Sequence, residues 1–61
     1  MAGGLSTDDL EQVWEALAQA IDQAGERREL FLAKLALLLA HEIGDRAAVD
    51  RLIRATLEDL A

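Results

Sequence analysis

Cysteine and proline are both absent from this 61-residue sequence, and aromatic residues make up only 3% of it. Without cysteine, the chain forms neither a disulfide nor a cysteine-based metal site. With no proline and only four glycines, little interrupts a helix from within. The remaining residues are rich in alanine, leucine, glutamate, glutamine, arginine and aspartate, which favours helices over strands. The sequence therefore predicts a small all-α protein.

Positive charge is also scarce, because six Lys and Arg residues face twelve Asp and Glu, for a net charge of −6. This balance argues against nucleic acid and anionic membrane surfaces as partners. The longest apolar run, residues 30–40, is interrupted by Lys34 and is shorter than the ~20 apolar residues of a membrane span. The N-terminus has no basic segment followed by an apolar run, so no secretory signal is predicted. We expect a cytoplasmic protein.

The chain is expected to form one domain of three helices over residues 5–61, preceded by a flexible tail at residues 1–4. Ser6 and Thr7 are N-cap candidates for the first helix, because their hydroxyls accept hydrogen bonds from free backbone N–H groups. Gly25 is expected to end this helix, since glycine tolerates the positive φ of a C-terminal cap. The apolar stripe of the first helix has helical spacing and consists of Leu10, Val13, Trp14, Leu17, Ile21 and Ala24.

The second helix is expected over residues 26–43, ending at Gly44, and Asp45 is the N-cap candidate for the third. On the third helix, Asp50 and Arg54 have the i, i+4 spacing of an ion pair. Its apolar stripe consists of Val49, Leu52, Ile53, Thr56 and Leu60. The expected architecture is therefore a helical hairpin plus a third helix.

The second helix is apolar around most of its circumference, with a narrow polar strip at Arg27, Lys34 and His41. Such a helix must be buried on most sides. Two flanking stripes of roughly 100° each cover only about half of it, and the rest would be a larger exposed patch than monomers tolerate. We therefore expect assembly into an oligomeric helical bundle or docking on a larger protein. A three-helix monomer with a generous core is the alternative.

The candidate interface residues are five on the second helix and one on the first. The Trp is either a partner anchor or part of its own helix's core, since Trp is common at interface hot spots. The set is Trp14, Leu32, Leu35, Leu38, Leu39 and Ile43.

No catalytic, cofactor-binding or metal-binding residues are predicted. His41 is the only histidine, and it lacks a second His, a Cys or the Glu-x-x-His pair of di-iron bundles. Asp8, Asp9 and Glu11 are explained by the helix dipole, which favours negative charge in the first turn. The arginines alternate with acids and lack aromatic neighbours, which again argues against nucleic acid.

The segments Leu5–Leu10 and Leu35–Asp45 resemble a family of short bacterial proteins, domain-of-unknown-function family 2783. The similarity covers nearly the whole chain, through an L-x-x-x-D-L start and an LLLA-x-x-IGD helix end. The resemblance implies a stand-alone small helical protein. It further implies an accessory role beside a larger enzyme, because members tend to be encoded next to flavin-dependent aromatic hydroxylases. It supplies no catalytic residues.

Three functions remain open from the sequence. The leading one is a non-catalytic protein–protein interaction module, such as a stabilising subunit of a larger enzyme, which lays an apolar helix face into a groove. The second is a purely homo-oligomeric structural protein. The third is a small ligand-binding or metal-binding bundle that uses His41 and nearby carboxylates.

Overall fold

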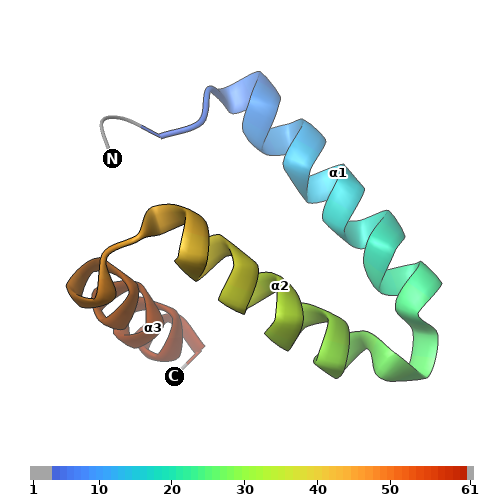
Figure 1. The fold of residues 1–61 in the computed structure, drawn as a ribbon. Coiled ribbons are helices and arrows are strands. Elements are labelled where there is room, and N and C mark those ends of the chain that lie inside the picture. The colour runs from blue at the N-terminus through green and yellow to red at the C-terminus, as the bar shows by residue number, and fades with distance from the viewer. Residues whose placement is uncertain (1–3, 61) are drawn as a thin grey trace.

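Three α-helices make up most of residues 4–60, the part of the chain that the computed structural model describes (Figure 1). Within this part there is no strand, which confirms the all-α prediction. Of the predicted flexible tail, residues 1–3 lie outside the described residues, and Gly4 is exposed. In chain order the elements are α1 (Thr7–Ala24), the 3-10 turn η1 (Gly25–Arg27), α2 (Arg28–Ile43) and α3 (Arg46–Leu60).

The first helix begins and ends where its capping residues predict. The Ser6 hydroxyl accepts a hydrogen bond from the Asp9 backbone N–H at 3.1 Å, which satisfies one of the donors left free at a helix start. At the other end, Gly25 has φ 57° and its N–H donates to the Ile21 carbonyl. A positive φ is costly for residues with a Cβ. The local sequence therefore determines both ends of α1.

The second helix begins later than predicted. Residues 25–27 form a 3-10 turn, so α2 starts at Arg28 and not at Glu26. The Gly25 carbonyl accepts from the Arg28 backbone N–H and, at 3.4 Å, from its guanidinium Nη1. Because these bonds close the tighter i→i+3 ring, they hold the connector in a turn before regular α-helix begins.

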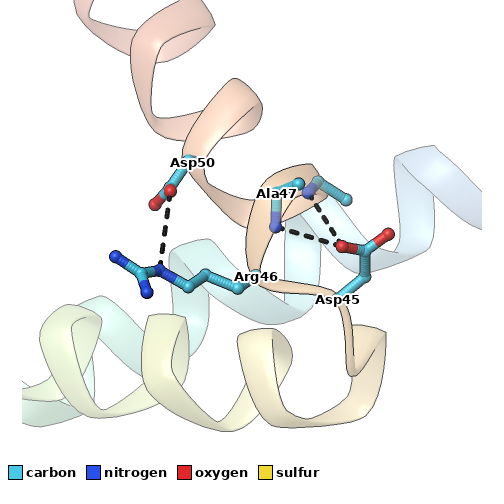
Figure 2. A network of polar contacts seen from close by, with 5 residues as sticks. Asp45, Arg46, Ala47 and Asp50 are labelled. Atoms are coloured by element: carbon cyan, nitrogen blue, oxygen red, sulfur yellow. Dashed lines mark hydrogen bonds and ion pairs between the residues drawn. The ribbon is translucent and has the colours of Figure 1, made fainter.

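The junction between α2 and α3 is as short as the sequence predicts. Gly44 adopts the left-handed conformation (φ 69°, ψ 19°), and its N–H donates to the Ala40 carbonyl at 3.0 Å. Asp45 Oδ1 then accepts from the backbone N–H groups of Ala47 and Ala48, at 3.0 and 3.3 Å (Figure 2). One glycine cap and one aspartate cap thus turn the chain within two residues.

The expected ion pair on α3 forms with a different arginine. Asp50 lies 3.9 Å from Arg46 Nε (Figure 2), and this is the only ion pair between side chains of residues 4–60. The pairing with Arg54 is therefore not the one observed. Both arginines are four residues from Asp50, so the spacing alone did not distinguish them. The Arg46 side chain is 95% exposed, and such pairs stabilise a helix by only a few tenths of a kcal/mol.

The three helices diverge from their connections and do not close into a bundle (Figure 1). The radius of gyration is 12.9 Å, against about 10.5 Å for a compact domain of this length. None of the described side chains is buried. The half-buried ones gather near the two joints, and α1 does not contact α3. They are Leu17, Ala20, Ile21, Ala24, Phe31, Leu35, Ala40, Ile43, Ala48 and Val49.

Among residues 4–60, none of the helices combines the length and the apolar character that crossing a bilayer requires.

Asp45 provides a test of the local caps. We expect Asp45→Ala to lower the free energy of unfolding by about 1 kcal/mol, since two backbone donors lose their acceptor. Asp45→Asn should retain most of it, because asparagine caps equally well. Urea unfolding followed by circular dichroism at one fixed protein concentration measures both. Equal stability of the Ala and Asn variants would contradict the capping role.

Candidate interaction surface

The chain exposes far more surface than a folded monomer of its size. Its solvent-accessible surface is 5867 Å² for 6.6 kDa, whereas a compact monomer of this mass exposes about 3,900 Å². The excess is about 2,000 Å², more than the ~800 Å² that each partner buries in a standard interface. Much of it is apolar, since thirteen large hydrophobic side chains are exposed. Exposed apolar helix surface is therefore the unusual feature of this structure.

The predicted interface residues of α2 are left largely uncovered by α1 and α3. Leu32, Leu38 and Leu39 are 41%, 66% and 54% exposed. Leu35, in the middle of α2, and Ile43, its last residue, are half-buried. The flanking helices thus cover less of α2 than the half expected from the width of their stripes.

Four of these five residues share one face of α2. Leu32, Leu35, Leu39 and Ile43 follow the i, i+3, i+7, i+11 spacing that keeps side chains on one side of a helix. Leu38 lies about 100° around the axis from Leu39.

Two further leucines, Leu30 and Leu37, extend the apolar surface of α2 to its opposite side. They lie roughly 160–180° around the axis from Leu39 at ~100° per residue, and Leu37 is 72% exposed. The helix therefore presents apolar side chains in nearly every direction, as its sequence predicts.

Trp14 is 75% exposed on α1. It borders a shallow apolar depression of about 140 Å³ that it lines with Leu17, Ala18 and Ile21, all on its own helix. Nothing from α2 or α3 covers it. Of its two predicted roles, core of its own chain does not describe this position, and the role of partner anchor stays a prediction.

Sequence reasoning missed a groove between α2 and α3. It has a volume of about 450 Å³ and is apolar except for Thr56. The Thr56 hydroxyl donates to the Leu52 carbonyl at 2.9 Å, so its hydrogen-bonding need is met within the helix. The lining residues are Ala36, Leu39, Ala40, Val49, Leu52, Ile53, Thr56 and Leu57. The signal for it was the apolar stripe of the third helix, which was expected to be covered within the chain.

This surface has no cluster of metal-ligating side chains among the described residues. Within residues 4–60, no three His, Cys, Asp or Glu side chains lie close enough together to hold a metal ion. His41 lies beside Gly44 and Asp45 along an open surface depression at the α2–α3 junction. The depressions described here along residues 4–60 are open, and the exposed side chains that border the two apolar ones are suited to association with another apolar surface.

Comparison with family models, with curated proteins and with solved structures finds no match to this chain. The resemblance to the short bacterial family therefore stays a prediction.

Trp14, the only tryptophan, reports on its own surroundings. If it is a partner anchor, its fluorescence emission will move to shorter wavelength as the protein assembles, because the indole leaves water for an apolar contact. A dilution series through the association range measures the shift. Emission that stays at the position of a water-exposed indole in the assembled protein would remove Trp14 from the interface.

Proposed function

We propose that this protein is a non-catalytic protein–protein interaction module, whose helices complete their hydrophobic core only against another chain. The absence of any buried side chain among residues 4–60 is the observation that carries the proposal. Burial of apolar surface is the dominant favourable term in folding. A 61-residue chain without disulfides has little other means of stabilisation. An oligomeric helical bundle built around α2 is the assembly that this surface supports best.

Exposed leucines on both sides of α2 favour an obligate assembly over a transient one. Obligate interfaces are larger and more apolar, resembling a domain core cut in half. Each chain has about 2,000 Å² of excess surface to bury, which is in the range of permanent complexes. The acidic net charge of −6 supports the exclusion of nucleic acid from the candidate partners.

No catalytic step is assigned to the chain. The two apolar depressions described above are open, and their one polar side chain, Thr56, already donates its hydroxyl to the Leu52 carbonyl and has no base beside it. An accessory subunit of a larger enzyme and a purely homo-oligomeric protein use the same surface. The two functions differ in whether the apolar surface is covered by a different protein or by a second copy of this chain.

Native mass spectrometry of the purified chain tests the proposal. We expect masses that are multiples of 6.6 kDa, or a complex with a co-purified protein of defined mass. A stable, helical, lone chain across the micromolar range would overturn the proposal, because its leucines would then be tolerated in water.

Leu39→Asp tests the placement of the interface on α2. A carboxylate in an apolar contact has no partner to offset its desolvation, so we expect the assembly to weaken at least ~10-fold or the chain to unfold. Lys34→Asp is the matched control, because it places the same group on the polar strip of the same helix. Sedimentation and circular dichroism report mass and helicity. An unchanged mass and helicity for Leu39→Asp would show that the interface lies elsewhere.

A further inference from the structure

We infer that the groove between α2 and α3 receives α1 from a second copy of this chain, and that the exchange is reciprocal in a dimer. The inference rests on the proposed function and names the occupant of the exposed surface. Its structural basis is that each chain carries both halves of the contact and leaves both unpartnered.

The receiving half is the apolar groove described above, with Leu39 on one wall and Leu52, Ile53 and Leu57 on the other. It is open to solvent, and the hydroxyl of Thr56, its one polar side chain, already donates to the Leu52 carbonyl. A groove of this kind accepts an amphipathic helix through its apolar anchors.

The inserting half is the N-terminal part of α1. Its stripe residues Leu10, Val13 and Trp14 are all exposed, whereas Leu17 and Ile21, nearer the turn, are half-buried. The stripe is therefore covered by its own chain only at the end where α1 joins α2. The free end has the i, i+3, i+4 spacing with which helices dock into grooves.

Charge complementarity supports this pairing. The helix α1 carries five carboxylates and no basic residue, while all six Lys and Arg residues lie between Arg27 and Arg54. By its position around α3, Arg46 lies between Ile53 and Leu57 at one edge of the groove, where it pairs with Asp50. Glu11 is the carboxylate next to the Trp14 edge of the α1 stripe. An acidic helix docked in the groove would bring a carboxylate to this arginine at its rim, which orients the partners.

The connector argues for a second copy over closure of α1 onto its own groove. The Gly25 N–H donates to the Ile21 carbonyl, and the Gly25 carbonyl accepts from the Arg28 backbone N–H and guanidinium. With this turn in place, α1 makes no contact with α3 of its own chain, so closure onto its own groove requires a different connector conformation. Reciprocal exchange fills both grooves while the turn keeps its hydrogen bonds.

The area agrees with a stable dimer. Two separate chains expose about 11,700 Å² together, and one compact particle of their combined mass exposes about 6,400 Å². Association into such a particle removes roughly 5,000 Å², which matches obligate dimers.

Disulfide trapping between two differently marked chains tests the inference, because the native chain has no cysteine. One chain carries Val13→Cys. A second, enriched in nitrogen-15, carries in turn Val49→Cys, Leu52→Cys, Ile53→Cys or Leu57→Cys, so that the result does not depend on the register of docking. Gln12→Cys, on the polar side of α1, replaces Val13→Cys in the control, and circular dichroism verifies the helicity of each variant.

In a glutathione redox buffer, we expect at least one groove position to form the mixed disulfide ~10-fold or more faster than the Gln12→Cys control, because docking raises the effective thiol concentration. Rates equal to the control at all four positions overturn the inference. A chain carrying both Val13→Cys and Ile53→Cys that closes an internal disulfide at single-chain mass also overturns it, in favour of closure within one chain.

The mass of the unsubstituted protein distinguishes the two possible failures. An assembly without the cross-link leaves the interaction module standing and removes only this occupant, whereas a lone chain removes both.

Discussion

The apolar circumference of α2 is the constraint on which the rest of this structure depends. A helix with leucines on opposite sides needs neighbours on opposite sides, and the chain supplies only two, each touching α2 near a joint. The shortfall arises because the helices diverge from their joints and do not close around α2 (Figure 1). The exposed face and the open groove both follow from this shortage of covering surface, and the proposal that another chain covers them rests on it.

The features that could be predicted from sequence are those set by local chemistry. Ser6, Gly25, Gly44 and Asp45 mark helix ends because each satisfies, or permits, a specific backbone hydrogen bond within four residues. The apolar character of α2 likewise follows from side-chain spacing alone. These signals do not depend on the tertiary arrangement, so the three helices and the excess of apolar surface could both be predicted from the sequence.

The features that could not be predicted depend on more distant geometry. The start of α2 at Arg28 depends on the 3-10 turn that follows Gly25, and 3-10 and α-helical turns have similar sequence preferences. The angle at which the helices diverge depends on how side chains pack across the joints, which spacing does not encode. The groove beside Leu52 and Ile53 was missed for the same reason, since the apolar stripe that signals it was expected to be covered by the chain's own helices.

The connector at residues 25–27 has a consequence at the level of assembly size. A helix and a groove on one chain that fit each other make a head-to-tail contact, and such contacts either close into a ring or continue into a filament. The relative rotation of the two subunits decides which occurs, and the proposed reciprocal dimer is the smallest closed case. In that dimer the rotation would depend on the angle between α1 and the groove of the same chain, across the hydrogen-bonded turn that has glycine at its first position. Under this proposal, a change at Gly25, remote from the leucines of the groove, has the means to convert a finite particle into a polymer.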